Sequence, residues 1–265
     1  MNISLTKKLV IVASLLAFPL SSQAVIWIHD DDALATIDPN SGIVTDVGSF
    51  GVNDTMTDIA FDSNGDLFGI SFGRLYSINS STGAATSVGP GWATGMNALE
   101  IVGTTAYAMS STDDNLWSID LGTGIASNLG SLGTGTSSSG DLALFNGDMY
   151  GSINIPADNA LLDVDVAVPG ASSIVGAGFG VTNIFGLAED GGLLYALESG
   201  GGIYTVNTGT GTLNNIGSAV FTSNVRQIFG ATSTQNTTVP DGGTTLPLMA
   251  LPLLGVYLLR RKLVS

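Results

Sequence analysis

Leu75-Tyr76-Ser77-Ile78-Asn79-Ser80-Ser81-Thr82-Gly83 is the clearest copy of a phrase that recurs along this chain of 265 residues. In each copy an apolar segment ends at Asp or Asn, and a glycine closes the polar stretch that follows. The other copies are Ile37-Asp38-Pro39-Asn40-Ser41-Gly42, Ile119-Asp120-Leu121-Gly122-Thr123-Gly124, Val206-Asn207-Thr208-Gly209-Thr210-Gly211 and the looser Val164-Asp165-Val166-Ala167-Val168-Pro169-Gly170. The closing glycines are 41, 41, 46 and 41 residues apart. A steady period of this length is typical of a fold built from one repeated unit.

Each copy predicts two strands joined by a tight turn. Asp or Asn at the start of the turn can bond its own backbone, and glycine at its end can adopt positive φ. The segment after the glycine alternates between apolar and polar residues, as in a strand with one buried face. A second glycine lies six residues beyond each closing glycine. These five glycines are Gly48, Gly89, Gly130, Gly176 and Gly217.

Two further apolar segments precede each phrase, which gives four short strands per copy. Four antiparallel strands in about 41 residues form one blade of a β-propeller. The first copy starts at Val25-Ile26-Trp27-Ile28 and lacks an innermost strand, whereas residues 227–231 resemble the innermost strand of the fifth copy, residues 183–187. The sequence therefore predicts an all-β, five-bladed β-propeller closed by its C-terminal strand. A β-sandwich and an open solenoid are the alternatives. The fourth copy has an insertion, residues 155–159, that we expect to form an extra loop.

Composition narrows the chemistry of this chain. Charged residues make up 11% of the sequence, glycine occurs 36 times and cysteine is absent, which excludes thiol chemistry and cysteine-based zinc sites. From Asp30 to Asp241 the chain has 22 acidic and two basic residues, a formal charge of −20. Such a charge repels phosphate backbones and excludes nucleic acid as a partner. It attracts cations, so weak, non-specific calcium binding is expected, and no cofactor is predicted.

Residues 1–24 have the pattern of a secretory signal peptide. Lys7 and Lys8 precede an apolar stretch, and small residues lead to Ala24. We expect signal peptidase to cleave between Ala24 and Val25. The alternative is an N-terminal membrane anchor, for which the apolar run is short.

The C-terminal 27 residues have three parts in order. Val239-Pro240-Asp241-Gly242-Gly243 is followed by an apolar stretch over residues 246–259 and by the basic cluster Arg260-Arg261-Lys262. The basic cluster should stay on the cytoplasmic side, and the apolar stretch is near the lower limit for a membrane span. The alternative is an ordinary C-terminal membrane anchor.

This tail resembles the PEP-CTERM family of sorting signals. The usual motif of that family is Val-Pro-Glu-Pro, and the Val239-Pro240-Asp241-Gly242-Gly243 stretch resembles a variant of it. The resemblance implies processing by an exosortase-type enzyme in a Gram-negative bacterium that secretes extracellular polysaccharide. It implies a membrane-anchored precursor and a product at the cell surface or outside the cell. The blade phrase also resembles repeats of bacterial propellers that serve binding, scaffolding and occasionally catalysis.

Candidate sites in the body of the chain are few. His29, the sole histidine, adjoins Asp30-Asp31-Asp32; the four could hold a cation or form an acidic loop between strands. Asp62-Ser63-Asn64-Gly65-Asp66 lacks the downstream glutamate of a calcium loop, and it predicts a hairpin turn, as does Asp113-Asp114-Asn115. Trp27 and Trp117 are expected in the core. No catalytic, cofactor-binding or metal-binding residues are assigned.

We therefore predict four segments: a signal peptide (1–24), a propeller (25–232), a linker (233–238) and a sorting signal with a transmembrane segment (239–265). The predicted function is that of a non-enzymatic structural or binding protein at the cell surface or in the extracellular matrix. Its predicted partners are signal peptidase, an exosortase-type enzyme, extracellular polysaccharide and, before processing, the membrane. The alternatives are a propeller enzyme acting on a glycan or small ligand and a calcium-dependent adhesin. An enzyme should concentrate carboxylates at one channel mouth.

Overall fold

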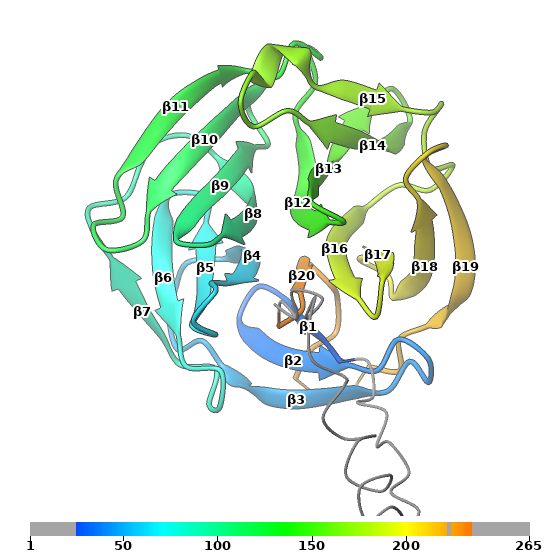
Figure 1. Ribbon diagram of the computed structural model, residues 1–265. Coiled ribbons are helices and arrows are strands. Elements are labelled where there is room, and N and C mark those ends of the chain that lie inside the picture. The colour runs from blue at the N-terminus through cyan, green and yellow to red at the C-terminus, as the bar shows by residue number, and fades with distance from the viewer. Residues whose placement is uncertain (1–24, 222–223, 235–265) are drawn as a thin grey trace, which may run out of the picture.

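The computed structural model describes residues 25–221 and 224–234, and these form a β-propeller of five blades (Figure 1). Each blade is an antiparallel sheet of four strands, and the sheets are arranged around one axis. The predicted all-β class, the blade number and the four strands per repeat are confirmed, so a sandwich or an open solenoid is wrong. The predicted signal peptide and the sorting signal lie outside the described residues.

The strands of each blade follow one another from the axis to the rim. Blade 1 has β20 (Gly230–Thr232), β1 (Ile26–His29), β2 (Ala33–Ile37) and β3 (Val44–Ser49). Blade 2 has β4 (Met56–Phe61), β5 (Leu67–Ser71), β6 (Arg74–Ile78) and β7 (Ala85–Val88). Blade 3 has β8 (Met96–Val102), β9 (Thr105–Ser110), β10 (Asn115–Asp120) and β11 (Ala126–Ser131). Blade 4 has β12 (Ser138–Phe145), β13 (Asp148–Ile155), β14 (Asp158–Val164) and β15 (Ser173–Val175). Blade 5 has β16 (Ile184–Asp190), β17 (Leu193–Glu198), β18 (Gly202–Asn207) and β19 (Thr212–Ser218).

The last strand closes the ring, as predicted. β20 pairs with β1 in antiparallel register, with Ala231 opposite Ile28. The strand starts at Gly230, three residues later than the predicted segment 227–231, because Phe229 precedes the ladder and donates its N–H to the His29 carbonyl at 2.8 Å. Ile228 is instead a buried core residue. Closure pairs the inner edge of blade 1, which would otherwise be open.

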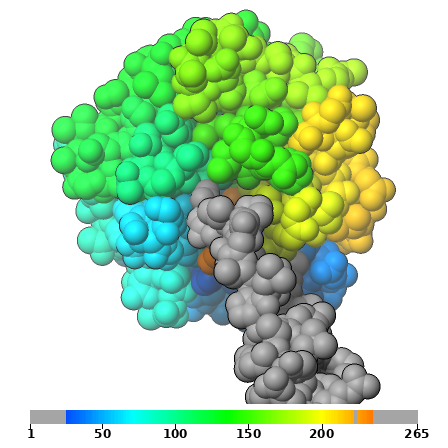
Figure 2. Space-filling model, in the orientation of Figure 1, coloured from blue at the N-terminus to red at the C-terminus, as the bar shows by residue number. Residues whose placement is uncertain are grey.

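The hydrophobic core is divided into five clusters, each between two neighbouring blades. The cluster between blades 5 and 1 contains Ile26 from the first strand of the domain, Leu197 from blade 5 and Ile228 from the closing segment. Blade 1 is therefore held by side-chain packing on both sides as well as by the β20 ladder. Figure 2 shows the blades following one another around the disc in chain order.

The paired glycines of the repeat mark contacts between blades. Gly83 closes the outer turn of blade 2 with φ of +79°, and a Cβ there would lie 2.4 Å from the Gly48 carbonyl oxygen of blade 1. The same close approach joins Gly124 to Gly89 and Gly211 to Gly176. Between blades 5 and 1, Gly42 meets the Ser218 carbonyl oxygen, which lies 2.2 Å from the Cβ position. The six-residue spacing thus arises because the turn of one blade packs against the outer strand of the preceding blade.

Blade 4 departs from this pattern, as its longer repeat suggested, but the expected extra loop is wrong. Residues 155–159 extend β13 and β14 into a longer hairpin, with Ile155 opposite Asp158 and a tight turn in which Ala157 has φ of +66°. The extra residue of the outer turn forms a short 3₁₀ helix, η1 (Pro169–Ala171). Because this turn is wider, a Cβ at Gly130 of blade 3 would have no atom within 4 Å.

Candidate functional site

The starts of the inner strands surround a pocket on the propeller axis, which we call the mouth pocket. All five blades contribute to it, and its volume is about 170 Å³. Its lining residues are Thr55, Thr57, Phe72, Asn97, Ser139, Gly140, Phe185 and Phe229. The lining has no ionisable side chain, and its surface is mostly apolar. Pockets of this kind, with a few polar groups among aromatic side chains, are typical small-molecule sites.

Asn97 is the polar side chain of the mouth pocket that stands out. Its side chain is 7% exposed, and its Oδ1 has no hydrogen-bond partner. The hydroxyls beside it are already engaged, because Thr57 donates to the Ile70 and Met96 carbonyls at 3.1 and 3.2 Å. Ser139 likewise donates to a backbone carbonyl at 3.1 Å. A buried amide oxygen without a donor is costly to the fold, and such a group is rare unless it has a role.

Two buried carboxyl groups, from Asp58 and Asp141, lie one residue beyond the pocket lining on β4 and β12. Both residues are fully buried. Asp58 accepts the N–H of Leu99 on β8 at 2.6 Å, and Asp141 accepts the N–H of Leu187 on β16 at 2.6 Å. Asp141 Oδ2 also accepts the N–H of Ala231 on β20, at 3.0 Å. These carboxyl groups tie the inner strands of different blades to one another.

The two carboxyl groups also contact each other and share a proton in the reading we adopt. Burial raises the pKa of Asp58 well above its usual value, and the neighbouring charge of Asp141 raises it further. Burial likewise raises the pKa of Asp141. Asp141 Oδ1 has no donor while both groups are ionised, since carboxylates only accept. One proton held between the groups supplies that donor and removes the repulsion.

Glu100 repeats this arrangement one blade further on. It is 8% exposed, and its Oε2 accepts the N–H of Leu144 on β12 at 2.9 Å. Glycines leave room for the carboxyl groups at the axis. A Cβ at Gly230 would lie 2.4 Å from Asp58 Oδ1 and 2.5 Å from His29 Nε2. The axial carboxyl groups are thus committed to the backbone, and the axis beneath the mouth pocket is filled.

Sequence reasoning did not find these axial groups. Their signal is an acidic residue inside an otherwise apolar strand, as in Thr57-Asp58-Ile59-Ala60 and Gly140-Asp141-Leu142-Ala143. The positions of the acidic residues are irregular among the blades, so the repeat itself does not single them out.

His29 does not join the three aspartates that follow it. The His29 side chain is fully buried, and burial lowers its pKa to about 4. Its Nδ1 lies 2.7 Å from the Asp30 carbonyl oxygen, while its Nε2 is at the axis beside Gly230. The predicted four-residue cation site is therefore wrong, because the strand directs the imidazole inward and the turn directs the carboxylates outward.

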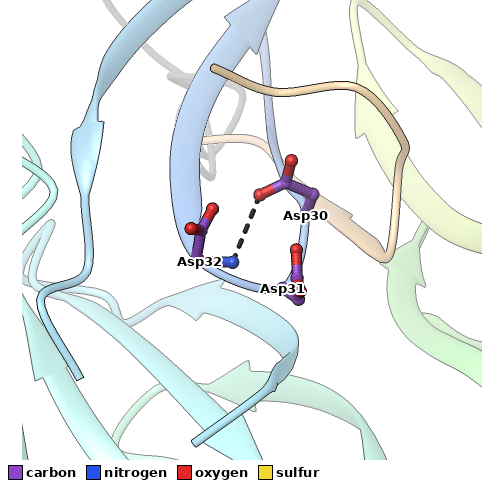
Figure 3. Close-up of side chains that lie close together, drawn as sticks. All are labelled: Asp30, Asp31 and Asp32. Carbon is purple, nitrogen blue, oxygen red and sulfur yellow. Dashed lines mark hydrogen bonds between the residues drawn. The ribbon is translucent and has the colours of Figure 1, made fainter. Parts of the chain in front are cut away.

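Asp30, Asp31 and Asp32 do gather in the turn between β1 and β2 (Figure 3). Over residues 25–221 and 224–234 they are the one group of three potential metal ligands that lies within 4.8 Å. Asp30 is already engaged: Oδ1 accepts the N–H groups of Asp32 and Ala33 at 3.2 and 3.0 Å, and Oδ2 accepts that of Arg226 at 3.2 Å. Burial raises the pKa of Asp30. The acidic loop reading fits this turn, in which Asp30 fastens the closing segment to blade 1.

The two predicted hairpin turns are confirmed. Asp62 Oδ1 accepts the N–H groups of Asn64 and Asp66, both at 2.9 Å, between β4 and β5. Asp113 Oδ1 accepts that of Asn115 at 3.0 Å between β9 and β10. Trp27 and Trp117 are partly buried against the core clusters. These acidic groups serve the turns that contain them.

A second hollow, of about 460 Å³, lies between blades 3 and 4. Its lining includes Tyr107, Asp148, Asp163 and Asp165. It opens at the junction where the contact between paired glycines is missing, so the wider outer turn of blade 4 creates it. Its carboxylates are too far apart to form a three-ligand group.

The residues predicted for export lie outside the described part of the chain, with the exception of Val25. These are Ala24, the motif Val239, Pro240, Asp241, Gly242 and Gly243, and the basic residues Arg260, Arg261 and Lys262. Within the described residues, no helix has the length and apolar character needed to cross a membrane.

Comparison with known proteins identifies the fold and no family. No protein-family model and no curated protein matches the sequence. Solved structures do match, among them a chain in the "Crystal structure of Nidogen/Laminin Complex", with a TM-score of 0.50 and 11% identity. The match covers 79% of this chain and 97% of that chain. At this identity the likeness supports the propeller fold alone.

Proposed function

We propose that this chain is an exported structural or binding protein, located at the cell surface or in the extracellular matrix of a Gram-negative bacterium. Signal peptidase cleaves between Ala24 and Val25, and an exosortase-type enzyme processes the chain at Val239-Pro240-Asp241-Gly242-Gly243. Arg260, Arg261 and Lys262 hold the precursor in the membrane until that step. The product acts near extracellular polysaccharide.

The observation that carries the binding role is how the carboxyl groups of the propeller are distributed. Asp58, Glu100 and Asp141 are buried at the axis and accept backbone N–H groups. A carboxylate pair for acid–base catalysis needs contact with substrate, which these groups lack. Other acidic side chains lie in turns at the two faces, for example Asp38 and Asp120, so they are not focused at one channel mouth.

Two further features support the proposal. The β-propeller is a rigid ring that leaves both faces open for contact, as is common where binding residues sit on loops of a fixed scaffold. The similar chain belongs to a complex of nidogen with laminin, so a propeller of this general shape is compatible with a role in assemblies. Of the alternatives, calcium-dependent adhesion finds little support, because Asp30 already accepts backbone N–H groups.

Processing in the native host tests the sorting step. Pro240→Ala combined with Asp241→Ala should leave an uncut form in the membrane fraction, whereas Thr244→Ala combined with Thr245→Ala, just outside the motif, should be processed normally. N-terminal sequencing of the released protein should begin at Val25. Unchanged release of the Pro240 and Asp241 variant would remove the sorting part of the proposal.

A further inference from the structure

The mouth pocket has the properties of a ligand site and takes no part in holding the ring together. Phe185 and Phe229 meet edge to face there, with ring centroids 6.3 Å apart and an interplanar angle of 71°. Phe72, from the β5–β6 turn, is 49% exposed, which is unusual for so large an apolar side chain. Apolar cavities of roughly 150 Å³ hold one benzene ring, so the volume of about 170 Å³ suits a single aromatic ring.

Asn97 supplies the polar half of the site. Its Oδ1 is an acceptor without a donor, on a side chain that is 7% exposed and lines the pocket. The hydroxyls of Thr57 and Ser139 already donate to backbone carbonyls, so they leave this acceptor unsatisfied. A ligand that brings one O–H or N–H donor would satisfy Asn97, and its ring would contact the phenylalanines.

We propose that the mouth pocket binds a small, uncharged aromatic ring bearing one hydrogen-bond donor, of the phenol type. The ring packs against Phe185 and Phe229 and the hydroxyl donates to Asn97 Oδ1. The inference rests only on the binding part of the proposed function, because a chain that is not sorted as proposed would still bind this ligand.

Other ligand classes fit the lining less well. A charged ligand would lose its hydration with no opposite charge in the lining to replace it. A sugar ring inserted into the pocket would bring several hydroxyls where one acceptor is free, and the unpaired hydroxyls would be desolvated at a cost. The lining therefore favours a mostly apolar ring with a single donor.

The test compares p-cresol with toluene on the purified full-length chain, by NMR titration. The two probes have nearly the same shape, but toluene lacks the donor. We expect p-cresol to bind with a dissociation constant on the order of 0.1 to 1 mM, as small ligands of this size do. We expect toluene to bind about tenfold more weakly, which corresponds to one buried neutral hydrogen bond. N-acetyl-tyrosinamide, which bears the same ring, will show by binding that a polypeptide can supply it, and by failing to bind that only a free phenol fits.

Three variants locate the site. Thr55→Trp places a large side chain at the exposed rim of the pocket and should abolish binding, whereas Thr104→Trp, in the exposed turn between β8 and β9, should not change it. Asn97→Leu should reduce the preference for p-cresol over toluene to about onefold. The same substitution should raise the midpoint of thermal unfolding, because it removes an unsatisfied buried amide. This rise separates a ligand group from a structural one.

Three results would overturn the proposal. The first is the absence of saturable p-cresol binding to the folded chain, and the second is equal binding of p-cresol and toluene. The third is binding to the Thr55→Trp variant that matches binding to the Thr104→Trp variant, which would place the ligand elsewhere. None of these results depends on whether the chain is sorted by an exosortase.

Discussion

Asp141→Asn should change the pH dependence of folding more than any other single conservative substitution at the axis. Asp141 Oδ2 accepts the N–H groups of Leu187 and Ala231, and an amide oxygen can keep both bonds. The amide nitrogen would then take the place of Oδ1, which has no donor in the ionised pair. Its N–H can donate to the Asp58 carboxylate, so the amide replaces the shared proton.

The sign and size of the effect follow from the raised pKa of the pair. Burial and mutual repulsion raise the pKa of Asp58, so the folded protein keeps a proton that the unfolded chain releases near pH 3.9. Stability from this pair is therefore greatest in acid and falls as the pH rises toward the raised pKa. The slope for one retained proton is about −1.4 kcal/mol per pH unit. The variant lacks the shared proton, so its advantage over the native chain should grow by up to that amount per unit.

Urea unfolding at pH 5, 6, 7 and 8 measures this difference, with Asp163→Asn, an exposed aspartate of the same blade, as the matched control. The control should follow the pH dependence of the native chain. Asp141→Ala leaves the N–H groups of Leu187 and Ala231 without an acceptor and should cost about 2–6 kcal/mol at every pH. Parallel pH profiles for the native chain and Asp141→Asn would refute the shared proton.

Three other substitutions test the ring. Gly124→Ala should destabilise the chain by at least about 2 kcal/mol, because its φ is +66° and its Cβ would lie 2.3 Å from the Val88 carbonyl oxygen; Gly122→Ala, in the same turn without either constraint, should cost less than about 1 kcal/mol in urea unfolding. Ile228→Ala removes a fully buried side chain that packs the closing segment against blades 5 and 1, and calorimetry should show a loss of about 2–5 kcal/mol; a loss below about 1 kcal/mol would mean that closure contributes little. Asn79→Ala deprives the N–H groups of two turn residues of their acceptor and should cost about 1 kcal/mol; equal denaturation midpoints would show that the turn forms without it.

Local chemistry explains why the blade pattern was predictable. Asp38, Asn79, Asp120 and Asn207 each accept backbone N–H groups within their own turn, which is a short-range interaction that sequence alone determines. Alternation of apolar residues then sets strand pairing within a blade. The count of five blades followed because each copy repeats the same local code and the closing segment resembles an inner strand.

Positions across the axis were not predictable in the same way. Asp58, Glu100 and Asp141 belong to different blades, and their partners are backbone groups 41 to 90 residues away in sequence. The loop expected at residues 155–159 became a longer hairpin because pairing of β13 with β14 satisfies more backbone groups than a loop would.

The sequence by itself determined the period, the turn type, the strand order within a blade and the segment that closes the ring, because each depends on neighbours in the chain or on a period-two pattern. Tertiary structure alone decided which glycines touch between blades, which carboxyl groups fill the axis and where Asn97 is left without a donor. These features arise only when five copies are brought around one axis, since each requires atoms from separate blades to meet.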